Sequence, residues 1–266
     1  MAESTEGRMS EGRPVAPSPP RFSLVIPAFN EEALLPRLLD SVDRARVLYD
    51  GGPESIEVIV ADDGSTDATA GIARERGCRA VAAGARRIAR ARNAGARQAR
   101  GTILAFVDAD SQVHPETFNM IDCLLDSGRV IGGTTGAVFE RQSAGLRCTF
   151  TGIALLGLAF RGTRALRNRG MDTGVVFCAR ADFEAIGGYR ENYRWGEDVW
   201  LLFDLRRRGW RSGRRLEGAT RAPAVFSTRK FDRYGDWHYF TMPFRIGWEA
   251  LRGRDDAARR YWYGPR

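Results

Sequence analysis

Short apolar segments alternate with helical segments along the first 110 residues of this chain. Residues 23–28 (SLVIPA), 56–61 (IEVIVA) and 102–107 (TILAFV) are each suited to a buried strand, and a weaker candidate lies at 79–82. The segments are roughly 20 to 35 residues apart, which leaves room for a crossover helix between successive strands. This alternation predicts an α/β fold whose central sheet is mostly parallel.

The helices between these strands have predictable ends. Asn30 is placed to cap the first helix, and Pro36 lies near its first turn, where a missing N–H costs little. Thr66 or Asp67 is placed to cap the second helix, which Gly77 ends. A third, basic helix is expected over about 88–100.

The second half of the chain is less regular. Strands are expected at 130–139 and 175–179, and an apolar helix is expected at 146–166. A further helix is expected at 197–208 and is predicted to stop at Gly209. From residue 222 onward, arginines and aromatic residues are frequent and no clear periodicity is present.

These patterns divide the chain of 266 residues into three parts. Residues 1–20 are rich in Pro, Ser and Glu and are predicted to be a disordered tail. The main domain is expected at 21–221, with a first half at about 21–110 and a second half at about 111–221. Residues 222–266 form an extension rich in arginine and aromatics.

Charge and composition restrict the partners of the chain. The net charge is +8 and Lys230 is the only lysine, so nearly all positive charge is carried by arginine. Arginine suits anionic partners such as phosphates, nucleic acid and acidic lipid headgroups. With only two histidines, His114 and His238, a histidine-based triad or a zinc enzyme is not expected.

Acidic residues follow two of the expected strands directly. Asp108 and Asp110 are one residue apart, and two carboxylates in this arrangement can hold Mg²⁺ or Mn²⁺ while leaving positions open for phosphate oxygens. The alternative is an Asx-turn or a helix cap. Asp62 and Asp63 precede a glycine, and helix capping does not explain two adjacent carboxylates there. One of them can accept from the N3–H of uracil or a similar base.

A third acidic pair, Glu197 and Asp198, follows Trp195 and Gly196 at the start of an expected helix. One of these carboxylates can act as a general base that deprotonates an acceptor hydroxyl. The alternative is structural, because acidic residues at a helix N-terminus stabilise the helix dipole.

Taken together, the acidic clusters match a known arrangement in order and spacing. The chain resembles the family-2 glycosyltransferases, which are enzymes of the GT-A fold. The matching segments are SLVIPAFNEEALL at 23–35, VIVADDGSTDAT at 58–69, ARNAGARQARGTILAFVDAD at 91–110, TGVVFCARADFEAIGGY at 173–189 and GEDVWLLFDLRRRG at 196–209. The resemblance implies a GT-A type three-layer α/β/α sandwich and a hexosyltransferase that uses a nucleotide-sugar donor.

The resemblance makes 21–110 the nucleotide half and 111–221 the acceptor half of the main domain, and it also assigns a nucleotide pocket. The residues that it implies are Pro27, Phe29, Glu31, Asp62, Asp63, Arg92 and Asp108. Asp63, helped by Asp62, would read the base, and Arg92 would face the base or the diphosphate.

The reacting groups carry over by position as well. Asp108 and Asp110 resemble the DxD motif and would hold Mg²⁺ or Mn²⁺, with Asp110 as the more direct ligand. Asp198 resembles the catalytic base, and Glu197 lies beside it. The resemblance implies that the hydroxyl attacks the anomeric carbon from the far face, so that configuration inverts in one step.

Two departures from the family favour a single transfer over polymerisation. The QxxRW motif of processive synthases and their membrane helices are absent from this sequence. Arg229 or Arg233, in the stretch RKFDRY, would close over the diphosphate instead.

Other functions explain the same residues less well. No GxGxxG follows the first strand, and the loop PAFNEE is acidic, which disfavours a dinucleotide-dependent oxidoreductase. A P-loop enzyme is excluded because no GxxxxGK[ST] is present. The arginines are scattered, so no nucleic-acid partner is expected. A catalytically inactive nucleotide-sugar-binding protein stays open as an alternative.

The sequence also bears on location. The first twenty residues have no apolar core of a signal peptide, and the longest apolar stretch, 152–160, is far shorter than the roughly 20 residues that span a bilayer. A cytoplasmic enzyme with a saccharide or lipid-linked acceptor is therefore expected. Residues 150–160 are apolar and flanked by arginines, which suggests peripheral contact with the inner face of the cell membrane; a core helix or a dimer contact is the alternative.

Overall fold

The structure of the protein is a computed structural model, and it describes residues 19–84, 86–141, 174–193, 196–229, 232 and 235. Several expectations lie outside these residues. They concern the disordered tail through residue 18, the helix at 146–166, the apolar segment at 150–160, Trp195, Arg233 and residues 236–266.

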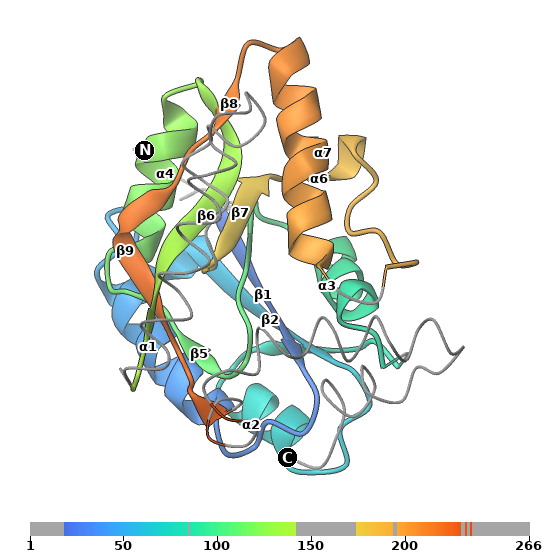
Figure 1. Cartoon of the computed structure of the whole chain (residues 1–266). Helices are drawn as coiled ribbons and strands as arrows, with labels where there is room; N and C mark the ends of the chain where they lie inside the picture. Colours follow the sequence, from blue (N-terminus) through green and yellow to red (C-terminus); the bar gives the residue numbers. More distant parts are fainter. Residues whose placement is uncertain are drawn as a thin grey trace, which may run out of the picture.

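The described strands form one mixed, largely parallel sheet in the order β3-β2-β1-β4-β7-β6-β9-β5, with β8 beside β6 (Figure 1). The strands are β1 Phe22–Ala28, β2 Ile56–Asp62, β3 Arg79–Ala82, β4 Ile103–Phe106, β5 Ser111–Gln112, β6 Val130–Phe139, β7 Val176–Ala179, β8 Arg215–Leu216 and β9 Ala219–Phe226. Strands β1 to β4 run parallel, as predicted. Strand β7 is antiparallel to β4 and β6, while β6 is parallel to β8 and β9.

Helices cover both faces of this sheet, so the predicted three-layer α/β/α arrangement is confirmed. The helices are α1 Leu35–Val47, α2 Thr69–Glu75, α3 Ile88–Arg97, α4 Thr117–Asp126, α6 Arg180–Ala185 and α7 Glu197–Arg211, with a short 3-10 turn, η1, at Pro53–Ser55. In Figure 1, α1 and α4 lie to the left of the sheet, and α3, α6 and α7 lie to its right.

The position of β1 in the sheet explains why nearly all of its residues are apolar. Leu24 and Ile26 belong to the core beneath α1 and α4, whereas Val25 belongs to the core beneath α3 and α7. Because both faces are covered, every residue of β1 is buried. Fully burying a side chain such as Leu24, Val25 or Ile26 stabilises the fold by about 1.5 to 3 kcal/mol.

Helix α3 lies very close to β1 because Gly95 faces the strand. A Cβ atom at Gly95 would lie 2.4 Å from Cγ1 of Val25, so a larger residue would push the helix away. This close packing fixes the position of Arg92, which lies one turn earlier on the same helix.

Some predicted ends of helices are wrong. Asn30 does not cap α1, which begins at Leu35 without a side-chain cap. Asn30 instead adopts a φ of 51° and binds the neighbouring loop. Gly209 does not end α7, which continues to Arg211. A Cβ atom at Gly209 would lie 2.7 Å from the carbonyl oxygen of Arg214, so this glycine serves close packing.

Strand β9 continues across position 221, where the main domain was expected to end. Residues Ala219 to Phe226 pair with β6 on one side and partly with β5 on the other. The division of the chain into a nucleotide half, an acceptor half and an extension remains a prediction.

Candidate active site

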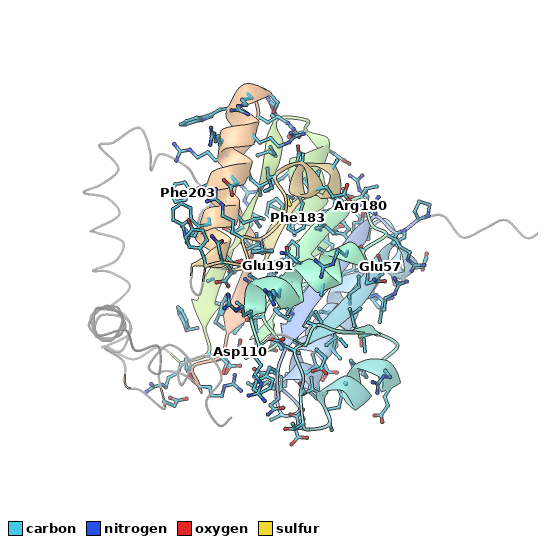
Figure 2. The ribbon with its side chains drawn as sticks, turned by 90° about the vertical axis from the view of Figure 1, so that its right-hand side faces the viewer. Glu57, Asp110, Arg180, Phe183, Glu191 and Phe203 are labelled. Carbon is cyan, nitrogen blue, oxygen red and sulfur yellow. The ribbon has the colours of Figure 1, made fainter. Side chains whose placement is uncertain are left out.

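Three of the predicted clusters lie where parallel strands end. Phe29 and Glu31 follow β1, Asp62 ends β2 and is followed by Asp63, and Asp108 follows β4 by two residues. The carboxyl ends of parallel strands meet at one edge of a sheet, which is where ligands of α/β proteins bind. Figure 2 labels Asp110 near this edge.

The loops after β1 and β2 hold each other in place. The main-chain N–H of Asn30 donates to Oγ of Ser65 at 2.9 Å, and the N–H of Thr66 donates to Oδ1 of Asn30 at 2.8 Å. The N–H of Glu31 donates to Oγ1 of Thr69 at 2.8 Å. Side chains thus satisfy main-chain groups that neither strand nor helix uses, and the two loops form one rigid rim.

The adjacent carboxylates of Asp62 and Asp63 make different contacts. Oδ1 of Asp62 accepts from the N–H of Ser65 at 3.1 Å and shapes the turn after β2. Asp63 is buried, and its Oδ1 accepts from the N–H of Arg86 at 2.7 Å. The guanidinium of Arg86 lies 5.3 Å from the centre of the Phe29 ring. Phe29, Asp63 and Arg86 therefore form one corner of the site.

Pro27 lies beneath this corner. It is buried within β1 and pairs with Ala61 of β2. The pairing of β1 with β4 ends at Val25, so the missing N–H of Pro27 disturbs no pairing on that side.

Arg92 lies at the centre of three carboxylates. Its Nη1 donates to Oε1 of Glu197 at 2.7 Å and to Oδ1 of Asp198 at 2.8 Å. Its Nη2 donates to Oδ1 of Asp108 at 2.7 Å. The side chain is only 3% exposed. Arg92 therefore joins α3, the end of β4 and the start of α7, and directs both terminal nitrogens to carboxylates.

The charge of Arg92 is stabilised by its surroundings. Burial by itself would lower the pKa of the guanidinium, but the carboxylates of Asp198, Asp108 and Glu197 outweigh burial and hold that pKa well above its ordinary value. Three carboxylates around one guanidinium leave a net negative charge at this place.

Tyr189 completes the cluster, and sequence reasoning missed it. Its hydroxyl donates to Oδ1 of Asp198 at 2.9 Å, and its ring centre lies 5.2 Å from the guanidinium carbon of Arg92. The N–H of Tyr189 donates to Oδ1 of Asn93, and its carbonyl accepts from Nδ2 of Asn93. Helix α3 therefore positions both Arg92 and Tyr189. The only sequence signal was the position of Tyr189 at the end of the matching stretch IGGY.

Asp198 combines partial exposure with a raised pKa. Desolvation is the main cause that raises the pKa of this carboxyl to about 6, and Glu197 and Asp108 add to it. Arg92 and the hydrogen bond from Tyr189 act in the opposite direction. Both of these groups bind Oδ1, and within the described residues no donor binds Oδ2. The side chain is 35% exposed, so Oδ2 is the oxygen suited to accept a proton.

Arg229 connects the segment after β9 with the loop after β1. Its Nη1 donates to Oε2 of Glu31 at 3.0 Å, and its Nη2 donates to Oε1 of Glu31 at 3.0 Å. The same Nη2 also donates to Oδ2 of Asp110 at 3.2 Å. The paired hydrogen bonds between Arg229 and the two carboxylate oxygens of Glu31 make a strong, directional contact. The guanidinium of Arg229 also contacts Asp110, next to the site where a diphosphate was predicted.

The carboxylates of Asp108 and Asp110 fit a hard divalent cation. One oxygen of each binds an arginine, and no described donor binds Oδ2 of Asp108. Among the described residues, no three His, Cys, Asp or Glu side chains form a ready-made metal site. A cation held here would therefore need further oxygen ligands from water or from a substrate phosphate, which is how Mg²⁺ is commonly bound.

Comparison with known proteins agrees with this geometry. Residues 23–147 match the family model described as glycosyl transferase family 2. This segment of the chain belongs to that family. The matched residues run from β1 past the end of β6, so they include Asp63, Arg92, Asp108 and Asp110 and end before Asp198. The resemblance inferred from the sequence is thereby confirmed.

Curated relatives match part of the chain. One segment is 39% identical over 114 residues to a validoxylamine A glucosyltransferase from Streptomyces hygroscopicus subsp. limoneus, covering 38% of this chain and 24% of the relative. Another segment is 40% identical over 102 residues to a dodecaprenyl-phosphate galacturonate synthase from Rhizobium johnstonii, covering 36% of this chain and 29% of that relative. The chain thus spans about a quarter of the length of these curated relatives.

A solved structure of another protein shares the fold. The glucosyl-3-phosphoglycerate synthase from Mycobacterium tuberculosis, in complex with Mn²⁺, UDP and glucosyl-3-phosphoglycerate, aligns with a TM-score of 0.57 and 22% identity. The alignment covers 82% of this chain and 75% of that chain. The predicted GT-A type α/β fold is therefore confirmed. In the described part of the chain, no helix has the length and apolar character needed to cross a membrane.

Proposed function

We propose that this chain is an inverting glycosyltransferase that moves a sugar from a nucleotide-sugar donor to an acceptor hydroxyl in single transfers. The observation that carries the proposal is the position of Arg92 between Asp108 and Asp198. The candidate cation ligand and the candidate base both bind this one guanidinium. A leaving diphosphate near Asp108 and an acceptor hydroxyl near Asp198 would therefore be held close to the same reacting carbon.

The nucleotide would lie against the corner formed by Phe29, Asp63 and Arg86. This corner combines an aromatic ring, a buried carboxylate and an arginine. The ring can stack on a base, and a carboxylate can accept from a base N–H. Glu31 and Asp62 would orient the loops around the base through the contacts described above.

Asp108 and Asp110 would hold a divalent cation, Mg²⁺ or Mn²⁺. When bound, the cation would supply positive charge that stabilises the leaving diphosphate. The Mn²⁺ and UDP named for the mycobacterial synthase support this choice of cation and nucleotide. The negative charge left over around Arg92 is a further reason to expect a cation at this edge.

Asp198 would act as the general base. Its pKa of about 6 leaves the carboxylate largely ionised at neutral pH and still basic enough to take a proton from an attacking hydroxyl. Tyr189 and Arg92 fix Oδ1, so Oδ2 would be the oxygen that takes the proton of the acceptor. Glu197 would hold Arg92 in place, because its carboxylate is turned toward that guanidinium.

The acceptor would be a saccharide or a lipid-linked molecule. One relative is named a glucosyltransferase and another a dodecaprenyl-phosphate galacturonate synthase, which supports both classes as candidates. We place the enzyme in the cytoplasm, where nucleotide sugars would be its donors.

A ligand panel followed by product analysis tests the proposal. Thermal unfolding is measured with UDP-sugars, GDP-sugars and NAD(P), each with and without Mn²⁺. We expect a nucleotide sugar to raise the melting temperature only when Mn²⁺ is present, and NAD(P) to have no effect. With the selected α-linked donor, the product should be β-linked by the NMR coupling of its anomeric proton. Stabilisation by NAD(P) alone, or an α-linked product, would contradict the proposal.

A further inference from the structure

Exposed apolar side chains are concentrated on α7. Seven large apolar side chains are exposed within the described residues, and four of them belong to this helix. They are Val199, Trp200, Phe203 and Trp210, and Trp210 is 69% exposed. Figure 2 shows Phe203 on the side of α7 that points away from the sheet. Scattered apolar residues need no explanation, but a cluster on one helix does.

The spacing of these residues places them on one side of the helix. Val199, Phe203 and Trp210 repeat at intervals of four and seven residues, which brings them onto the same face. The opposite face is formed by Leu201, Leu202 and Leu205, which are buried in the core with β6 and β7. Helix α7 is therefore apolar both toward the core and along part of its outer side.

Arginines complete the outer side. Arg207 and Arg211 are exposed and make no ion pair within the described residues. The guanidinium of Arg206 lies 4.7 Å from the ring centre of Trp210. Near the start of the helix, Arg190 lies 5.3 Å from the ring centre of Trp200. We call the outer side the α7 face; it consists of Val199, Trp200, Phe203, Arg207, Trp210 and Arg211.

The charge of the α7 face restricts what can cover it. Asp204 of the same helix is already paired with Arg190, and Glu197 and Asp198 are turned toward Arg92. The face is therefore positive as well as aromatic. A second copy bound through the same face would bring arginines against arginines. A neutral saccharide would use the rings and leave the arginines without a role.

We propose that the α7 face docks the protein on an anionic lipid bilayer. Tryptophan and phenylalanine side chains favour the boundary between headgroups and acyl chains, and arginines bind the headgroup phosphates. Helix α7 begins at Glu197, so a bilayer along this face would lie close to the proposed base Asp198. The docking does not require the proposed reaction, because it depends on the surface of α7 alone.

Helix α1 offers a matched control. Val47 and Leu48, at its end, are exposed by 75% and 51%, and Arg44 one turn earlier is also exposed. In Figure 1 this helix lies on the opposite side of the sheet from α7. Substitutions there remove comparable apolar surface and charge without touching the α7 face.

The experiment measures binding of the full chain to vesicles by flotation. The vesicles contain phosphatidylcholine alone or an equal mixture of phosphatidylcholine and phosphatidylglycerol. We expect binding to the anionic vesicles only, with release at high salt. Arg207→Gln with Arg211→Gln should weaken binding about 25-fold, since each arginine near an anionic surface contributes about a factor of five. Phe203→Ser with Trp210→Ser should weaken binding at least as much.

The control variants decide the interpretation. Val47→Ser with Leu48→Ser, and Arg44→Gln, should bind vesicles like the wild type. Each variant is checked for an unchanged melting temperature and unchanged nucleotide binding, which separates this test from that of the proposed function. The inference is overturned if the wild type binds neither kind of vesicle or if the α7 variants bind as well as the wild type. A dimer that the α7 variants dissociate in light scattering would overturn it as well.

Discussion

The hydroxyl of Tyr189 donates to the same oxygen of Asp198 that Arg92 binds, at 2.9 Å and 2.8 Å respectively. Two donors on Oδ1 fix the orientation of the carboxylate, and within the described residues no donor binds Oδ2. The hydrogen bond from Tyr189 also stabilises the ionised form and lowers the pKa of Asp198, against the larger effect of desolvation. This relationship gives a prediction about pH.

Tyr189→Phe should move the acidic limb of the pH profile of kcat/KM to higher pH. The base must be ionised to accept a proton, so activity falls as pH drops through a pKa of about 6. Losing a hydrogen bond to a charged group costs about 1.5 kcal/mol, which corresponds to a rise of roughly one pKa unit. Tyr49→Phe is the control, because Tyr49 binds Asp122 far from the site. If the acidic limb of the pH profile did not shift, the pKa of Asp198 would not be what determines that limb.

Asp110→Ala should abolish the binding of nucleoside diphosphate that depends on Mn²⁺. The side chain lies beyond the end of a strand and not in the core, so the melting temperature should change little. Isothermal titration of the nucleotide with and without Mn²⁺ measures the effect. Asp40→Ala, on the exposed side of α1, is the control. If Asp110→Ala bound the nucleotide with Mn²⁺ as tightly as the wild type, Asp110 would not be a cation ligand.

Arg229→Gln should tighten the binding of Mn²⁺ several-fold when no nucleotide is present. Nη2 of Arg229 lies 3.2 Å from Oδ2 of Asp110, so the guanidinium competes with a cation for this carboxylate. Titration with Mn²⁺ alone measures the change. Arg76→Gln serves as the control, since Arg76 pairs with Asp40 and Asp43 on α1. Equal or weaker binding would show that the two cations do not compete.

Much of the sheet could be predicted because its strands are buried on both sides. Strand β3 has the predicted bounds, and β1, β2 and β6 differ by at most one residue at either end. Strand β9 was missed because it contains Thr220, Arg221 and Pro223, which break any regular apolar pattern. It forms through its pairing with β6, a contact between distant parts of the chain.

The site could be predicted only in part, for a related reason. Residue types and local spacing indicated the acidic clusters, since each is short and follows a strand or starts a helix. The partners of these groups are distant in sequence: Arg229 reaches Glu31 across 198 positions, and Arg92 reaches Asp198 across 106. Such pairs depend on how the layers pack, which a single sequence does not encode locally.

Asp182→Asn should reduce stability without affecting the site. The buried carboxylate accepts from Arg208 at 2.6 Å and from Arg214 at 2.7 Å, and so links α6 to the end of α7. Burial alone would raise its pKa, but the bonds from Arg214 and Arg208 lower it. Removing the charge should lower the free energy of unfolding by about 2 kcal/mol, because the arginines are partly exposed.

Urea unfolding at several pH values tests this prediction. A carboxyl whose pKa is lowered by folding contributes stability above its unfolded pKa of about 3.9 and loses that contribution as pH falls. The difference between wild type and Asp182→Asn should therefore be full at pH 7 and shrink below pH 4. A difference that does not depend on pH would assign the effect to packing, and weakened nucleotide binding would contradict the separation from the site.

The most direct test of the central claim compares Asp198→Asn with Asp204→Asn on the same helix. Asparagine at position 198 can keep the contacts with Arg92 and Tyr189 but cannot take the proton. Turnover of the nucleotide sugar should fall on the order of 10²-fold or more with donor affinity nearly unchanged, as expected for a lost general base. Asp204→Asn, which removes only a surface pair with Arg190, should retain turnover. Wild-type turnover in Asp198→Asn would contradict the role of Asp198 as the base.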